Sequence, residues 1–460
     1  MNVEILARLQ FALTIMFHYI YPPLSIGLGL ILVIIEAQYL ITKKPIFKEM
    51  AKFWTKVFAL TFALGVATGI VMEFEFGTNW STYSRYVGDV FGSALAAEGV
   101  FAFFLESGFL AILLFGWDRV GPKLHFFSTL MVCLGAHFSA IWIVVANSWM
   151  QTPAGYHIEG EGIRARAVIT NFWEMVFNPS SMDRLVHVTI GAWLAGAFLV
   201  ISVSAYYILK KKHLDFATRS LKVGLLVALG SVIFQGFSGD SSAKVTAEYQ
   251  PAKLAAMEGI YHTEKGASLT LFGIPNTREE KLEYAVGIPK LLSYLAHDDF
   301  DAEVKGLDQF PKKDWPNVPL VYSTYHIMIA MWGCMLITSI IGVYIWIKND
   351  LTKRKWPLYL LISSSIFPQI ANQVGWVTAE CGRYPWIVYN HLRISEGLSK
   401  IVTANQVLGS IIMFGFIYLL LFILFVVLLT EKFKAGPGAP VSHASQYRQQ
   451  QLVIKELSND

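Results

Sequence analysis

The chain has 460 residues, of which 54% are apolar and only 15% are charged, with a formal net charge of +4. A soluble domain carries about 25% charged residues, so this composition excludes a disordered chain and an ordinary soluble enzyme. Cys133, Cys334 and Cys381 form no C-x-x-C pair, which excludes a disulfide-stapled fold, a zinc ribbon and covalent haem attachment. The basic residues occur in short clusters that suit lipid headgroups better than nucleic acid. The composition indicates an integral membrane protein.

Nine stretches are long and apolar enough to cross a bilayer as helices, which takes about 17–25 residues each. In chain order they are 9–40, 57–76, 90–117, 124–148, 185–209, 223–237, 318–347, 356–379 and 401–430. Their length favours helices over barrel strands, which alternate over about ten residues. We therefore expect an all-α integral membrane protein with nine transmembrane helices.

Lys and Arg residues between the spans predict the orientation of the bundle. The first, third, fifth and seventh loops carry more than twice as many of them as the second, fourth and eighth. The basic set is expected in the cytoplasm, which places the N-terminus outside and the C-terminus inside. The first residues lack the basic region and cleavage site of a signal peptide, so the first span is expected to be retained.

One polar stretch interrupts the alternation of spans and short loops, and it predicts a long outer loop between helices six and seven. Loops of this length are usually functional or disordered. The Gly-Pro-Gly sequence and the glutamine run near the C-terminus predict a disordered tail. The expected parts are 1–237 with helices one to six, 238–317 as the outer loop, 318–430 with helices seven to nine, and 431–460 as a cytoplasmic tail.

Ionisable side chains inside a membrane span are costly and are candidates for function. The spans contain or end on several of them, together with one methionine among them: His18, Glu73, Glu75, Glu98, Glu106, His187, His326, Met328, Glu380 and Arg383. The helical rise of 1.5 Å per residue and the predicted orientation place the set in the outer half of the bundle. His and Met are iron ligands in haem proteins, whereas carboxylates can relay protons or form the ion path of a transporter. The pattern alone predicts a haem or ion site in the outer half.

Each of these side chains also has a purely structural interpretation. A single histidine in a span can be a hydrogen-bonded helix contact, Met328 can be core packing, and carboxylates near span ends can be solvated. Glu98 and Glu106 lie about 80° apart on a helix of 3.6 residues per turn, which fits a proton relay or an ion path. His125, at the predicted cytoplasmic start of the fourth span, is expected to be exposed.

Several strings, taken in order along almost the whole chain, resemble the cytochrome bd quinol oxidase subunit I family in its short quinol-loop form. They include RLQFALT at 8–14 followed by His18, FALGVATG at 62–69, MEFEFGTNW at 72–80, FFLES at 103–107, VANSWMQ at 145–151, KLAAME at 253–258, LFGIP at 271–275 and GWVTAECGRYPW at 375–386. The resemblance implies a quinol:oxygen oxidoreductase, a subunit of a terminal respiratory oxidase that oxidises membrane quinol on the outer side. It also implies that O2 is reduced to water with protons from the cytoplasm, so that a proton gradient forms without pumping.

The resemblance implies two b-type haems, one low-spin and one high-spin, and one haem d. His187 and Met328 match the axial ligands of the low-spin haem. His18 and Glu380 match the ligands of the two high-spin haems, without an assignment of which haem is held by which residue. Trp376 and Arg383 match residues that lie against the haems, and a guanidinium can pair with a haem propionate.

The resemblance also implies roles for five further residues. Glu98 matches a carboxylate beside the high-spin haems, and Glu106 and Ser139 match positions on a proton route from the cytoplasm. Lys253 and Glu258 match residues of the quinol-binding loop that influence quinol oxidation.

Two residues depart from the family pattern. His326 stands where the family commonly has an Arg two residues before the Met ligand, which affects the surroundings of the low-spin haem and creates a rival ligand beside Met328. Tyr384 replaces the usual Gln before Pro385, which is a mild change.

The expected partners are a second subunit of the cytochrome bd type and one or more small single-span subunits, in a bacterial or archaeal plasma membrane. Two other functions remain open: a di-haem quinone-linked electron-transfer subunit, and a proton-coupled transporter that uses Glu98, Glu106 and the histidines. The pair His187 and Met328, together with His18 and Glu380, favours the oxidase, because a transporter has no reason to keep these residues together.

Overall fold

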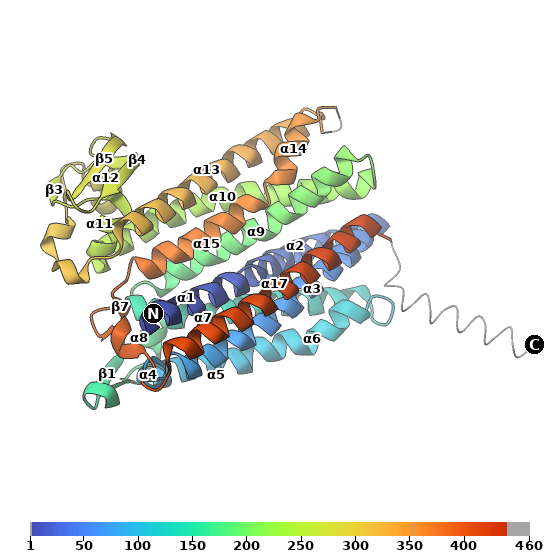
Figure 1. Cartoon of the computed structure of the whole chain (residues 1–460). Coiled ribbons are helices and arrows are strands. Elements are labelled where there is room, and N and C mark those ends of the chain that lie inside the picture. Colours follow the sequence, from blue (N-terminus) through green and yellow to red (C-terminus); the bar gives the residue numbers. More distant parts are fainter. Residues whose placement is uncertain (1, 352, 439–460) are drawn as a thin grey trace, which may run out of the picture.

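The computed structural model describes residues 2–351 and 353–438, and within them the protein is a bundle of long helices that lie side by side (Figure 1). Eight helical segments of the described chain are long and apolar enough to cross a membrane. They are α1 (Val3–His18) with α2 (Tyr21–Thr42), α3 (Pro45–Thr78), α5 (Gly88–Ala97) with η1 (Glu98–Phe103) and α6 (Phe104–Phe115), α7 (Pro122–Gln151), α9 (Ser181–Leu209), α10 (Leu214–Tyr249), α13 (Val318–Ile347) and α17 (Ala404–Ala435).

The eighth of the nine predicted spans, 356–379, is divided in the structure. It consists of α14 (Trp356–Ser363) and α15 (Ile366–Cys381), with a turn at Ser364 and Ser365. The hydroxyls of Ser363 and Ser364 donate to the carbonyls of Leu360 and Leu361 at 3.0 and 2.7 Å, and such side-chain bonds compete with the helix ladder. Because of this turn, neither piece has the length of a membrane span.

Three further predicted spans also differ from regular helices. The first breaks after His18 into α1 and α2, just before Pro22 and Pro23 at the start of the second helix, because proline cannot continue a helix from within. The third contains a π-turn, η1, at Glu98–Phe103. The sixth continues as α10 to Tyr249, well past the predicted end at Phe237, so the polar loop begins later than expected.

Nearly all short elements gather at the end of the bundle where the N-terminus lies (Figure 1). They are α4 (Ser81–Tyr86), β1 (Tyr156–Glu159), η2 (Gly162–Arg164), β2 (Arg166–Ile169), α8 (Phe172–Val176), α11 (Pro251–Glu258), β3 (Glu264–Lys265), β4 (Leu269–Asn276), β5 (Lys281–Ile288), α12 (Leu291–His297), β6 (Glu303–Val304), η3 (Leu307–Gln309), η4 (Lys312–Asp314), β7 (Trp386–Val388), β8 (Leu392–Arg393) and α16 (Ile394–Gly397). The strands form four antiparallel pairs, β1–β2, β3–β6, β4–β5 and β7–β8. The predicted outer loop therefore carries ordered structure, with the hairpin β4–β5 as its largest sheet.

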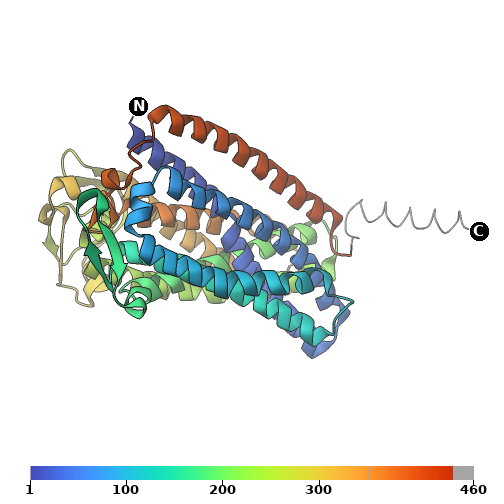
Figure 2. The ribbon, with the colours of Figure 1, turned by 90° about the horizontal axis from the view of Figure 1, so that it is seen from below.

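The main core lies between α2, α3, α9 and α10, where Trp54, Phe58 and Phe198 are fully buried. By contrast, α17 runs along one flank of the bundle and is the least buried span (Figure 2). Part of the predicted tail, 431–435, belongs to α17, and residues 439–460 of that tail lie outside the described residues.

The structure contradicts the expectation that His125 is exposed. Its ring is 3% exposed, its Nδ1 lies 3.0 Å from Glu36 Oε2, and it packs on Trp117 with the ring centroids 3.8 Å apart. Glu36 also accepts a hydrogen bond from the Thr129 hydroxyl at 2.8 Å. The hydropathy pattern missed this contact because Glu36 is a lone acid near the end of an apolar helix.

Candidate functional site

His18 ends α1, and its ring is oriented by a neighbouring helix. Its Nδ1 lies 2.9 Å from the Thr68 hydroxyl, which itself donates to the Leu64 carbonyl at 2.7 Å. The Thr68 oxygen must therefore accept from His18 Nδ1–H, which leaves the lone pair on Nε2. Histidines that bind metals are held in this way by an outer hydrogen bond, so His18 has the tautomer that an axial iron ligand needs.

Glu380 lies near the end of α15 in a dense polar cluster. Its Oε1 accepts from Asn147 Nδ2 at 3.0 Å and from Gln151 Nε2 at 3.4 Å. Its Oε2 forms an ion pair with the buried guanidinium of Arg383. Arg184, on α9, donates to the side-chain oxygen of Asn147. We call Glu380, Arg383, Asn147, Gln151 and Arg184 the Glu380 cluster.

Trp376 connects the surroundings of His18 with the Glu380 cluster. Its ring meets the Tyr19 ring edge-on at a centroid distance of 5.4 Å, and the Arg184 guanidinium lies 5.9 Å from its centre. Gln373, also on α15, donates to the Met16 carbonyl at 2.8 Å. Tyr19, next to His18, therefore contacts Trp376, which precedes Glu380 by one turn, and Gln373 joins α15 to α1.

His187 and Met328 lie on α9 and α13, and both helices pack against α10. The His187 ring contacts Gln235 Nε2 at 3.0–3.1 Å and the Ser238 hydroxyl at 3.2 Å, both on α10. One turn beyond Met328, the Trp332 indole donates to the Val232 carbonyl of α10 at 2.9 Å. The structure thus places His187 against α10, and α13, which carries Met328, packs on the same helix.

The sulfur of Met328 faces α15. A Cβ atom added to Gly375 would lie 3.0 Å from Met328 Sδ, so the missing side chain leaves room for the thioether. His and Met form a suitable ligand pair for a six-coordinate haem.

Glu98 and Glu106 both face α7. Ser139 donates to Glu98 Oε1 at 2.5 Å, and a Cβ atom on Gly135, one turn away, would lie 2.6 Å from Glu106 Cγ. A π-turn has more residues per turn than an α-helix, so η1 reduces the rotation between the two carboxylates. The predicted group of Glu98, Ser139 and Glu106 is therefore brought onto one helix face.

Lys253 and Glu258 lie on the same helix, α11, but contact different parts of the protein. They are five residues apart and so point about 140° away from each other. Glu258 faces Tyr325 of α13 and Thr270 of β4, whereas Lys253 faces Gln151 of α7 and the Glu380 cluster. The structure does not bring these two predicted quinol residues into one site.

Glu258 is only 1% exposed, and α11 lies outside the candidate membrane spans. Neither carboxylate oxygen has a hydrogen-bond partner of normal geometry within the described residues. Burial raises the pKa of Glu258 to about 7, although the nearby Tyr325 hydroxyl and Thr270 backbone act in the opposite direction. The Tyr322 hydroxyl is a second buried polar group without such a partner in the described part of the chain.

His326 connects the hairpin β4–β5 to α13. Its Nδ1 lies 2.9 Å from the Tyr322 carbonyl, its Nε2 lies 2.9 Å from the Thr270 carbonyl, and its ring stacks on Tyr322. Both ring nitrogens therefore face carbonyl oxygens in this structure. This residue, expected beside the haem as a rival to Met328, here holds strand β4 against the helix.

Four residues of these sites carry no prediction from the sequence: Arg184, Asn147, Gln151 and Gln235. The available signal was the pair Asn147 and Gln151, two amides one helical turn apart at the end of an apolar span. Arg184 is one of the basic residues between the predicted spans, and it precedes His187 by one turn. No sequence pattern around Gln235 distinguishes it from other polar residues of the predicted spans.

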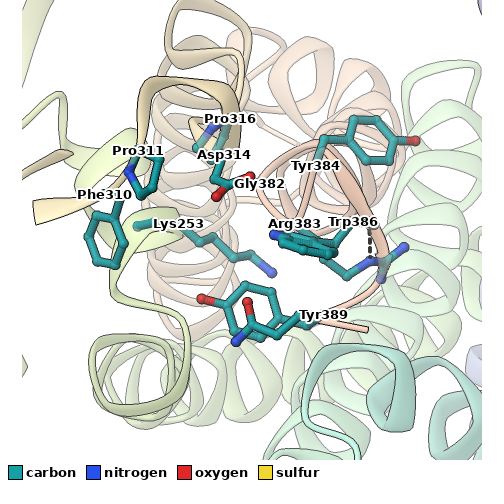
Figure 3. A pocket seen from close by; sticks show the side chains of 12 residues that line it. Lys253, Phe310, Pro311, Asp314, Pro316, Gly382, Arg383, Tyr384, Trp386 and Tyr389 are labelled. Carbon is teal, nitrogen blue, oxygen red and sulfur yellow. Dashed lines mark hydrogen bonds between the residues drawn. The ribbon is translucent and has the colours of Figure 1, made fainter. Parts of the chain in front are cut away.

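A cavity of about 260 Å³ opens beside the Glu380 cluster (Figure 3). Lys253 reaches into it toward Arg383, and Trp386, Tyr389 and Asp314 form other parts of its wall. It lies at the end of the bundle that carries the short strands.

The donor set fits haem better than a bare metal ion. Across residues 2–351 and 353–438, no group of three or more His, Cys, Asp or Glu side chains could hold an ion. A haem supplies its own equatorial nitrogens and needs only one or two axial ligands. His18 with a free Nε2, and the separate His187 and Met328, meet that need.

Comparisons with known proteins point to one family. The family model described as cytochrome bd terminal oxidase subunit I matches residues 6–437. The cytochrome bd ubiquinol oxidase subunit 1 of Bacillus subtilis (strain 168) is 38% identical over 446 residues, which cover 95% of this chain and 94% of that protein. The cytochrome bd-II ubiquinol oxidase subunit 1 of Escherichia coli (strain K12) is 34% identical over 510 residues, with 96% and 99% covered. The bd oxidase structure from Geobacillus thermodenitrificans matches with a TM-score of 0.87 at 28% identity, with 95% of this chain and 99% of that chain covered.

Proposed function

We propose roles for the buried polar groups on the premise that this chain belongs to the cytochrome bd terminal oxidase subunit I family. It is accordingly a multi-pass membrane protein, subunit I of a haem-containing terminal respiratory oxidase that oxidises quinol and works with a subunit II. The finer assignments concern the haem ligands, the quinol site and the path of the protons. We also propose a bacterial or archaeal plasma membrane as its location and one or more small single-span subunits as further partners.

The proposed haem set is a low-spin b haem on His187 and Met328, with a high-spin b haem and a haem d on His18 and Glu380. When bound, the haems carry electrons from quinol and reduce oxygen. The observation that carries this proposal is the orientation of His18, whose Nδ1–H is held by Thr68 so that Nε2 can bind iron. Trp376 would lie against the high-spin haems, and Arg383 would balance charge beside them.

The redox difference spectrum of the purified complex tests the haem set. We expect b-type bands together with a chlorin band further to the red. A colourless preparation would contradict the oxidase and favour the transporter. Two b-type haems without a chlorin would favour a di-haem electron-transfer subunit that does not reduce oxygen.

Quinol oxidation is assigned to Glu258, on the outer side of the membrane. A quinol must lose two protons as it gives up its electrons, and a carboxylate with a pKa near 7 is a suitable acceptor at neutral pH. The buried Tyr322 hydroxyl offers a second polar contact for the head group. Protons released here leave to the outside.

Protons for oxygen reduction are proposed to move from the cytoplasm along α7, from Glu106 through Ser139 to Glu98. The 2.5 Å hydrogen bond between Ser139 and Glu98 supports the last step. Uptake on one side and release on the other separates charge without a pump.

The Glu106→Gln variant tests this path. It keeps the shape of the side chain but cannot accept or donate the carboxyl proton, so oxygen reduction by the pre-reduced complex is expected to slow by about 10²-fold. Haem content should stay unchanged, and stopped-flow absorbance measures both. Glu431→Gln, at the exposed end of α17, is the matched control. An unchanged rate in the Glu106 variant would remove Glu106 from the route.

A further inference from the structure

We propose that the base of the β4–β5 hairpin is a lipid-binding surface, which lies at the boundary between the headgroups and the acyl chains of the leaflet at this end of the bundle. We define the hairpin base as Leu271 and Phe272 of β4 with Val286 and Ile288 of β5. The hairpin belongs to the polar stretch between α10 and α13 and lies outside the candidate membrane spans. The proposal therefore gives a membrane contact to a loop between two spans.

The hairpin base exposes large apolar side chains from both strands. Its four residues are 44–60% exposed, and Ile274 and Tyr284 add exposed surface beside them. The strand pairing places Phe272 directly opposite Val286, so the two strands contribute to one patch. A contiguous apolar patch of this kind marks a contact with a membrane or with another protein.

Two contacts with α13 show which end of the hairpin is nearer the middle of the bundle. The Thr270 carbonyl lies 2.9 Å from His326 Nε2, and a Cβ atom on Gly273 would lie 3.0 Å from the Tyr322 hydroxyl. Since α13 begins at Val318, the chain from Thr270 to Gly273 runs toward the beginning of α13. The hairpin base is therefore the end that lies deeper along the bundle.

The polarity of the hairpin changes in the same direction. The turn at its far end carries charged side chains, where Glu279 pairs with Lys281 and Glu280 pairs with Lys312. Charged groups stay in water, whereas apolar and aromatic side chains favour the membrane interface. A hairpin that is apolar at its deep end and charged at its far end suits a membrane surface.

The face of α13 below the hairpin continues as an exposed apolar surface. Ile337 and Tyr344 follow His326 by about three and five helical turns, so they lie on the same face of the helix. Both are 58% exposed, and α13 is a candidate membrane span, so this face contacts lipid. The hairpin base adjoins that face, and lipid is the occupant that continues across both.

The neighbouring helix α10 shows where the lipid-facing surface ends. α10 ends and α13 begins at the same end of the bundle, and the Trp332 indole donates to the Val232 carbonyl at 2.9 Å (Figure 1). His326 lies about 9 Å beyond Trp332, and the same rise on α10 leads from Val232 to about residue 238. Near this level the exposed side chains of α10 change from Phe237 to Asp240, which pairs with a lysine. The hairpin base thus lies where apolar surface gives way to charge, as at a headgroup boundary.

A fluorescent label on the hairpin base tests the proposal. The Val286→Cys variant of the complete oxidase complex is labelled with the dye NBD and placed in phosphatidylcholine vesicles. These vesicles contain a spin-labelled lipid with its nitroxide either near the headgroup or deep in the acyl chain. We expect the two quenching strengths to place the label about 5–10 Å into the boundary between headgroups and acyl chains. Iodide in the water should quench it weakly.

Two labels elsewhere calibrate the measurement. A label in Ile337→Cys, on the lipid-facing side of α13, should be quenched most by the deep nitroxide. A label in Glu279→Cys, at the turn of the hairpin, should be quenched by iodide and by neither lipid. The unsubstituted complex, carried through the same labelling, is the blank for Cys334 and Cys381. Each intensity is divided by that of the same sample in unmodified lipid, which removes any quenching within the protein.

Every outcome bears on the proposal. Tyr284→Cys, on the same strand and 77% exposed, replaces the Val286 variant if that complex does not assemble. Strong quenching by iodide without quenching by lipid would show that the face lies in water and would overturn the proposal. Protection from iodide and from both lipids would show that another subunit covers the face, and it would overturn the proposal equally.

Discussion

The Met328→Leu variant is expected to keep all three haems but to convert the six-coordinate low-spin haem into one with an open coordination position. Leucine has nearly the volume of methionine, so the packing of α13 against α15 beside Gly375 should survive at a cost below about 1.5 kcal/mol. What disappears is the thioether, the only part of the side chain that can bind iron. His187 alone would then leave one axial position open.

The measurement is carbon monoxide binding to the dithionite-reduced complex, followed by visible spectroscopy and by electron paramagnetic resonance of the oxidised form. A six-coordinate haem does not bind the gas, whereas the variant should bind it at one additional haem. Met335→Leu, two turns further along α13 and 3% exposed, makes the same change away from the proposed site and should behave like the original protein. Three unchanged haem signals in the Met328 variant would show that Met328 is not an axial ligand.

The helical membrane fold could be predicted because hydropathy and length are local properties of the chain. The breaks within the predicted spans are harder to predict from sequence. The turn between α14 and α15 depends on serine hydroxyls that turn back onto Leu360 and Leu361, and serine is also common in regular membrane helices. The break after His18 had a visible cause in Pro22 and Pro23, but proline near the start of a helix is also compatible with a continuous span.

The predicted angle between Glu98 and Glu106 depends on the helix being regular. A regular period of 3.6 residues was assumed, whereas η1 inserts a π-turn between the two carboxylates. No residue in that turn identifies it from sequence, and it lies where α5 and α6 pack against α7. Ser139 contacts Glu98 and Gly135 lies against Glu106, so both carboxylates face α7. This arrangement favours the proposed proton path more than a separation of about 80° around the helix does.

The sequence proposes candidate residues for the site but does not indicate how they group in space. Family strings identify Lys253 and Glu258 together because they are neighbours in the chain. Their contacts depend on how α11 rotates above α13, α15 and α7, which is a tertiary property. The burial of His125 is also a tertiary property, because its contact with Glu36 joins two helices that are far apart in sequence.

The Glu258→Gln variant is expected to slow quinol turnover by about 10²-fold, the usual contribution of a general base. Glutamine keeps the shape of the side chain between Tyr325 and Thr270 but cannot take a proton. The haem spectra and the rate of oxygen reduction with an artificial electron donor should not change, because neither depends on this site. Glu264→Gln, an exposed acid in strand β3 of the same loop, is the control.

The dependence on pH gives this experiment its sharpest readout. Burial raises the pKa of Glu258 to about 7, so the group is protonated and unable to accept a proton below that value. Above it the carboxylate is available, and turnover of the original protein should therefore rise as the pH increases through about 7. The variant should lack this rise, since glutamine does not titrate. A variant that turns over slowly but keeps the same rise would show that another group accepts the quinol proton and that Glu258 only shapes the site.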